Sequence, residues 1–184
     1  MIIKRFLQLN EKLESDSIKE IISQKEYLYD KIFNYIRFHL DDYKFEDEDD
    51  EDIIFDHIGD IWLHNKLSSG ELNIQFVDED DNGGDLYEFN GEEYQTLLKG
   101  INLTKVEVEE IITNYDNLLR DITKYLIDIK RIKKDVYVDY AYIDENNMLN
   151  ILHLDQNESG DYYKLSIEEY SNLLLYINTN KFNL

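Results

Sequence analysis

The sequence contains no cysteine and no proline, and its basic residues are few. Without cysteine the chain has no disulfide, no thiolate zinc site and no cysteine nucleophile, which favours a reducing, intracellular setting. The chain has 19 Lys and Arg residues against 41 Asp and Glu residues, and therefore a formal net charge of -22. Such a field repels DNA, RNA and anionic membranes and attracts cationic protein surfaces. We therefore expect a basic protein as partner, with no direct nucleic-acid binding and no membrane binding.

Long apolar runs are also missing. The N-terminal stretch MIIKRFLQLNEKLE has too short an apolar run for a signal peptide, and no segment approaches the roughly 20 apolar residues of a membrane span. We expect a cytoplasmic protein. Because 42% of the 184 residues are hydrophobic, the chain can bury a real core and is not a disordered acidic tail.

An internal repeat is visible between residues 72–102 and 149–178, with one gap opposite Gly84. The identical pairs are Leu72/Leu149, Asn73/Asn150, Ile74/Ile151, Asp78/Asp155, Gly83/Gly160, Asp85/Asp161, Tyr87/Tyr163, Glu92/Glu168, Glu93/Glu169, Tyr94/Tyr170, Leu97/Leu173, Leu98/Leu174, Ile101/Ile177 and Asn102/Asn178. This many identities indicate a tandem duplication, which would govern the whole fold.

Each repeat predicts a long helix, three short antiparallel strands and a short helix. Capping boxes at Ser17-x-x-Glu20 and Thr104-x-x-Glu107 mark the start of the long helices, and Asn90-x-x-Glu93 and Ser166-x-x-Glu169 mark the start of the short ones. The expected strands are about residues 58–64, 71–77 and 85–89 in the first copy, and about 136–143, 148–154 and 161–165 in the second.

The predicted fold class is therefore α+β, a tandem duplication of a helix, a three-stranded antiparallel meander and a short helix. The two expected lobes are residues 1–102 and 103–184, packed about a pseudo-twofold axis. In the second lobe, apolar residues from Val108 to Ile132 follow a strict heptad pattern. That seam could form a homodimer through helix 104–133, although packing against the other long helix of the same chain is the interpretation we favour.

The acidic stretch VDEDDNGGDLYEF, residues 77–89, matches the first half of a calcium loop through Asp78, Asp80, Asn82 and Gly83. The bidentate Glu that such a loop needs at its twelfth position is Phe89 in this copy and Ser166 in the other. A turn between two strands therefore explains the residues better, because Asp, Asn, Ser and Gly suit chain reversal. A calcium-binding regulatory module stays an alternative.

The first repeat also contains an acidic insertion at about residues 41–56. Ser17 and Leu72 are 55 positions apart, whereas the matching residues Thr104 and Leu149 are 45 apart. The extra residues are either a solvated charged loop or a partner-binding element, since loops added to a scaffold often carry function. The candidate partner-binding residues are Asp41, Asp42, Glu46, Asp47, Glu48, Asp49, Asp50, Glu51 and Asp52, followed by Asp78, Glu79, Asp80, Asp81 and Asp85.

The sequence contains no P-loop, no dinucleotide fingerprint, no nucleophile elbow and no H-E-x-x-H zinc motif. We therefore expect no enzyme, no catalytic residues, no cofactor and no metal. The expected function is an acidic inhibitor whose carboxylates replace phosphates in the basic nucleic-acid-binding groove of another protein. In composition and size, though in no motif, the chain resembles phage-encoded anti-CRISPR and anti-restriction proteins that mimic nucleic acid. An immunity protein that neutralises a basic toxin is the other alternative.

Overall fold

The computed structural model describes residues 2–39, 57–63, 72–77, 86–89, 91–157 and 159–182. The chain has an α+β fold. Its elements in order are α1 (Ile2–Phe38), β1 (His57–Leu63), β2 (Leu72–Val77), β3 (Leu86–Phe89), α2 (Gly91–Ile101), α3 (Lys105–Asp128), β4 (Tyr137–Ile143), β5 (Leu149–Leu154), β6 (Gly160–Lys164) and α4 (Ile167–Phe182).

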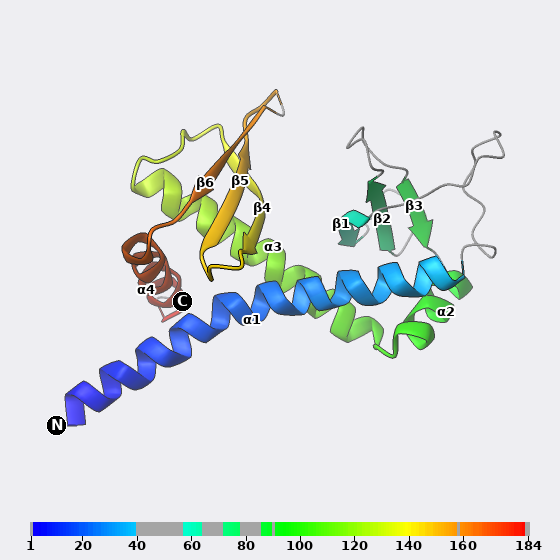
Figure 1. The fold of residues 1–184 in the computed structure, drawn as a ribbon, viewed down its shortest axis with the longest axis horizontal. Helices are drawn as coiled ribbons and strands as arrows, with labels where there is room; N and C mark the ends of the chain where they lie inside the picture. The colour runs from blue at the N-terminus through cyan, green and yellow to red at the C-terminus, as the bar shows by residue number, and fades with distance from the viewer. Residues whose placement is uncertain are drawn as a thin grey trace. The chain divides into compact units, whose positions relative to one another are not determined.

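The strands form two antiparallel sheets with the orders β1-β2-β3 and β4-β5-β6, as Figure 1 shows. All six predicted strands are confirmed to within one or two residues. The two sheets share their registers, because Ile61, Ile74 and Tyr87 lie across one sheet as Ala141, Ile151 and Tyr163 lie across the other. Each first strand also has a bulge at the same place. That this order of elements arose by duplication stays a prediction from the sequence.

Two compact units make up the chain, and they divide it differently from the predicted lobes. One unit is Lys25–Ile112, and the other is Met1–Gln24 with Thr113–Leu184. Each unit therefore takes its own part of both long helices. Three residues of α1, Leu28, Ile32 and Ile36, are fully buried in the core of the first unit because their spacing of four keeps them on one helical face.

The core of the second unit uses the earlier part of α1 in the same way. Ile18 and Ile22 are buried together with apolar residues of α3, the β4-β5-β6 sheet and α4. The predicted heptad seam supplies much of both cores: Val108 is buried in the first unit, and Tyr115, Leu118, Ile122 and Tyr125 are buried in the second. Packing within the chain thus accounts for the seam residues, whereas Ile129 near its end is 40% exposed.

A tyrosine of each long helix is hydrogen-bonded to the first strand of the sheet in its unit. In the second unit the buried Tyr115 hydroxyl donates to the Ala141 carbonyl at 3.0 Å and accepts from the Ala141 N–H at 3.0 Å. In the first unit the Tyr29 hydroxyl accepts from the Ile61 N–H at 3.1 Å. Ile61 and Ala141 occupy the same place in their sheets, so the two tyrosines are hydrogen-bonded to matching strand positions.

Two predicted capping boxes are confirmed. The Thr104 N–H donates to Glu107 Oε2 at 2.8 Å and the Glu107 N–H donates to Thr104 Oγ1 at 3.2 Å. The same reciprocal pair joins Ser166 and Glu169, at 3.0 and 3.2 Å. Asn90, the expected cap of α2, lies outside the described residues.

The prediction that a helix begins at Ser17 is wrong. Helix α1 begins at Ile2, so Ser17 lies well inside it. The physical reason is in residues 2–16, which are rich in Leu, Lys, Glu, Arg and Gln and contain neither glycine nor proline. These residue types favour helix, so nothing ends the helix upstream of Ser17.

Candidate interaction surface

The predicted partner-binding residues all lie outside the part of the chain that the structure describes. These residues are Asp41, Asp42, Glu46, Asp47, Glu48, Asp49, Asp50, Glu51, Asp52, Asp78, Glu79, Asp80, Asp81 and Asp85. Their roles therefore stay predictions.

The described acidic side chains all lie at the surface. Where burial is described, no Asp or Glu is buried, and the buried polar residues are Lys25 and Asn73. Some acids have cationic partners, such as Glu109 with Lys105 at 3.9 Å, but both of these side chains are more than 40% exposed. Exposed pairs of this kind contribute little to stability. The acidic side chains whose burial is described are thus reached by solvent.

One face of the β4-β5-β6 sheet is rich in tyrosine. Val138, Ala141, Leu149 and Ile151 are buried in the core, so the residues that alternate with them belong to the opposite face. We call this set the tyrosine face: Tyr137, Tyr140, Tyr142, Leu152, Leu154 and Tyr162. Asn150 and Lys164 share this face, and Tyr140 is half-buried and also packs against the core.

The strand register places the residues of the tyrosine face in rows. Tyr140, Leu152 and Tyr162 form one row across the three strands, and Tyr137 and Leu154 form part of the next. Tyr162 is 72% exposed and Tyr137 is 46% exposed. The rings of Tyr140 and Tyr142 lie side by side along β4, with centroids 5.8 Å apart. The face therefore offers large aromatic side chains to solvent on both edge strands.

Glycine at position 160 leaves room for the leucines of this face. A Cβ on Gly160 would lie 2.5 Å from Leu154 Cδ2 and 3.0 Å from Leu152 Cδ1, closer than carbon atoms can approach without a shift. The identity of this residue is thus tied to the packing of the tyrosine face.

The strands and turns that carry the tyrosine face are strongly acidic. Between residues 135 and 164 the only Lys or Arg is Lys164, whose ammonium is bound to the Asp144 carboxylate. The acids of the same segment are Asp135, Asp139, Asp144, Glu145, Asp155, Glu158 and Asp161. By count the segment is acidic, while Lys164 lies on the tyrosine face itself, in register with Asn150 and Tyr142, and Lys133 lies near Asp155.

Two aspartates close the turns at the ends of β5. Asp144 Oδ1 accepts the N–H groups of Asn146 and Met148 at 3.0 and 2.9 Å. Asp155 Oδ1 accepts those of Asn157 and Ser159 at 2.8 and 3.0 Å.

The hydrogen bonds from Asn157 and Ser159 lower the pKa of Asp155. The Lys164 ammonium, followed by the Met148 N–H, lowers the pKa of Asp144 to about 2. The turn interpretation of the acidic stretch is confirmed for its second copy. For the first copy it lies outside the described residues.

The Glu169 carboxylate joins the sheet, α4 and the segment after α3. Its Oε1 accepts hydrogen bonds from the Tyr163 hydroxyl at 2.5 Å and from Arg131 Nη2 at 2.6 Å, while Oε2 accepts the Ser166 N–H. These bonds lower the pKa of Glu169 to about 2. The matching pair of the first unit is looser, with Tyr87 Oη 3.3 Å from Glu93 Oε1.

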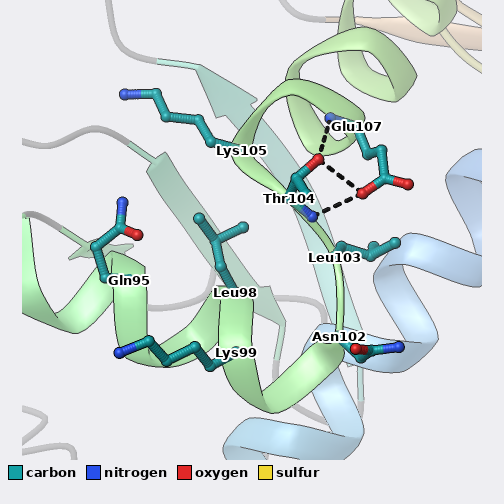
Figure 2. Close-up of a pocket in the computed structure, with 8 residues that line it drawn as sticks. All are labelled: Gln95, Leu98, Lys99, Asn102, Leu103, Thr104, Lys105 and Glu107. Carbon is teal, nitrogen blue, oxygen red and sulfur yellow. Dashed lines mark hydrogen bonds between the residues drawn. The ribbon is translucent and has the colours of Figure 1, made fainter.

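A pocket of about 550 Å³ lies where α2 turns into α3, lined by Gln95, Leu98, Lys99, Asn102, Leu103, Thr104, Lys105 and Glu107. Figure 2 shows Thr104 and Glu107 hydrogen-bonded to each other, with the side chains of Lys99 and Lys105 extending away from this pair. Their mutual hydrogen bonds lower the pKa of Glu107 and hold it as a carboxylate that caps the helix.

The sequence did not single out the residues of the tyrosine face. It did contain a signal for them, which the repeat alignment exposes. Where the second copy has Tyr140, Leu152 and Tyr162 in one row, the first copy has Asp60, Gln75 and Leu86 at the same register.

Within the described ranges, no three His, Asp or Glu side chains come together as metal ligands would. No helix in these ranges has the length and apolar character needed to cross a membrane. No protein-family model matches the chain, and comparisons with curated proteins and with solved structures give no match either.

Proposed function

We propose that this chain is an acidic interaction protein that inhibits a partner by occupying its basic, nucleic-acid-binding groove. The observation that carries the proposal is the net charge of -22 together with the absence of buried carboxylates from the residues whose burial is described. Charge that is not used inside the fold is free to act on another molecule. A guanidinium pairs with a carboxylate as it does with a phosphate, so the protein can replace the nucleic acid.

In this proposal the folded units and the acidic insertion have different roles. The packed units supply a rigid support, and the acidic insertion at about residues 41–56 supplies the densest run of carboxylates. Long-range attraction of this kind raises association rates more than it fixes affinity, and salt weakens it.

A pull-down from a bacterial lysate, repeated at low and high salt, tests the proposal. We expect a basic protein to be retained at about 50 mM salt and released at about 500 mM, because the Debye length shrinks severalfold. The retained protein should bind nucleic acid, and this chain should compete with that binding. If no basic protein is retained at low salt, or if nucleic acid and this chain bind the partner together, the proposal is wrong.

Two matched variants locate the charge that matters. In one, Asp47, Glu48, Asp49, Asp50, Glu51 and Asp52 become Asn or Gln; in the control, the exposed acids Glu20, Asp30, Glu92, Glu110, Glu145 and Glu168 do. Both variants lose the same net charge. We expect the first to weaken binding about tenfold or more and the control about threefold or less. Equal losses would assign binding to total charge rather than to the insertion.

A further inference from the structure

We propose that the tyrosine face of the β4-β5-β6 sheet binds an arginine-bearing segment of the basic partner. This inference rests on the proposed function, because it names the side chains by which a cationic partner is recognised. It concerns the tyrosine face and not the acidic insertion, so a separate measurement can support or contradict it.

The exposure of two tyrosines on opposite edges of the sheet is the first support. Tyr162 on β6 is 72% exposed and Tyr137 on β4 is 46% exposed. Adjacent strands lie about 4.8 Å apart, so β4 and β6 are about 10 Å apart across the sheet. A surface of this width can hold an extended peptide with more than one side chain in contact.

The charge around this face selects the partner. Asp135 and Asp139, on either side of Tyr137 in the sequence, are exposed, and Lys164, which lies on the same face as Tyr162, is bound to Asp144. An apolar or acidic segment would gain nothing from this field. A guanidinium can make two favourable contacts, because it stacks flat on an aromatic ring and pairs with a carboxylate through its edge.

The second unit already contains one such arrangement. The guanidinium carbon of Arg131 lies 5.6 Å from the ring centroid of Tyr163, while Arg131 Nη2 is 2.6 Å from Glu169 Oε1. This set of ring, guanidinium and carboxylate shows the chemistry that we propose for the opposite face of the same sheet. There, the chain supplies rings and carboxylates, and the partner supplies the guanidinium.

The matching row of the first sheet contains no tyrosine. This row is Asp60, Gln75 and Leu86. Asn73 in that sheet is buried, with 2% of its surface exposed, whereas its counterpart Asn150 is only half-buried. The second sheet is therefore the one that presents two exposed tyrosine rings, Tyr137 and Tyr162.

Binding of two peptides of equal charge to the full chain tests the inference. The probes are deca-arginine and deca-lysine, measured at low salt by calorimetry. Charge alone predicts equal affinities, whereas stacking on tyrosine predicts that deca-arginine binds about fivefold more tightly. The variant Tyr137→Ser with Tyr162→Ser should reduce this preference to less than about twofold. The matched control is Tyr27→Ser, because Tyr27 is a tyrosine of α1 that is 52% exposed.

The outcomes are separable. A preference for arginine that the double variant loses and the control keeps supports the inference. Equal binding of both peptides, or a preference that survives the double variant, overturns it and leaves the acidic interaction function standing. Failure of both peptides to bind at low salt overturns the inference and the proposed cationic partner together. Thermal melts that match the parent chain ensure that the variants are folded.

Discussion

The two units repeat their internal contacts but not their outward-facing residues. Both join a long helix to the first strand through a tyrosine hydroxyl, Tyr29 to Ile61 and Tyr115 to Ala141. Both join the third strand to the short helix through a tyrosine and a glutamate. The outer rows of the two sheets, by contrast, differ in kind. The contacts that hold an element in place are thus kept, while the residues of these matching rows are not.

The packing of the short helices, α2 and α4, also differs between the two units. Gly100 of α2 faces the Tyr35 ring, and a Cβ at this position would lie 1.9 Å from that ring. The residue of α4 that matches Gly100 in the repeat is Tyr176, whose own ring lies 5.5 Å from that of Tyr125. A large ring is thus supplied by the long helix in one unit and by the short helix in the other.

Removing the helix-to-strand hydroxyl from each unit gives the largest expected difference. Tyr115→Phe leaves both backbone groups of Ala141 without that partner in a buried place, and we expect it to lower the free energy of unfolding by about 3 kcal/mol. Tyr29→Phe removes the partly buried hydrogen bond from the Ile61 N–H and should cost about 1 kcal/mol. Urea unfolding measures both. Equal costs would show that the two bonds are interchangeable.

Removing the glutamate that joins sheet and short helix gives the next difference. Glu169→Gln weakens hydrogen bonds from Tyr163, Arg131 and Ser166, and we expect a loss of about 2 kcal/mol. Glu93→Gln, where the tyrosine lies 3.3 Å away, should cost less than about 1 kcal/mol. Chemical unfolding at pH 7 checks the pair, and a larger loss for Glu93→Gln would reverse the comparison.

The pH dependence of the same variant sharpens the test. The pKa of Glu169 is lowered in the folded protein from 4.5 to about 2, so the unfolded chain takes up its proton first as the pH falls. Its stabilising contribution is complete above about pH 4.5 and is lost between pH 4.5 and pH 2. Glu169→Gln should therefore flatten the fall of stability in this window. If the free energy of unfolding fell equally with pH in the parent chain and in Glu169→Gln, the lowered pKa of Glu169 would not be the cause of this loss of stability.

The smallest effects concern the two predicted helix starts. Thr104→Ala removes a hydroxyl that caps α3 and should cost about 1 kcal/mol. Ser17→Ala changes a residue inside α1 and should alter stability by no more than about 0.5 kcal/mol. If Ser17→Ala cost as much stability as Thr104→Ala, the result would support a helix that begins at Ser17 and contradict the start at Ile2.

The elements were predictable because their signals are local. Strand bounds follow from alternating apolar residues, as at Leu149 and Ile151, and caps follow from a hydroxyl three residues before a glutamate. The extent of α1 was not predictable from Ser17, because a cap pattern also occurs inside a helix that its neighbours favour. The tyrosine face was missed since a single strand shows which residues alternate but not which face is covered. Only the partnered register places Tyr140 and Tyr162 in one row.

The aspartate-closed turns bear on how fast a partner could bind. Asp144 and Asp155 each tie two backbone N–H groups to one carboxylate oxygen, and these turns lead into and out of the central strand. Leu152, which pairs with Tyr162, lies in β5. Both ends of β5 are therefore fixed before a partner binds. Binding of a partner to this sheet should therefore cost little conformational entropy in these turns. The association rate should be governed by diffusion and ionic strength rather than by a folding step.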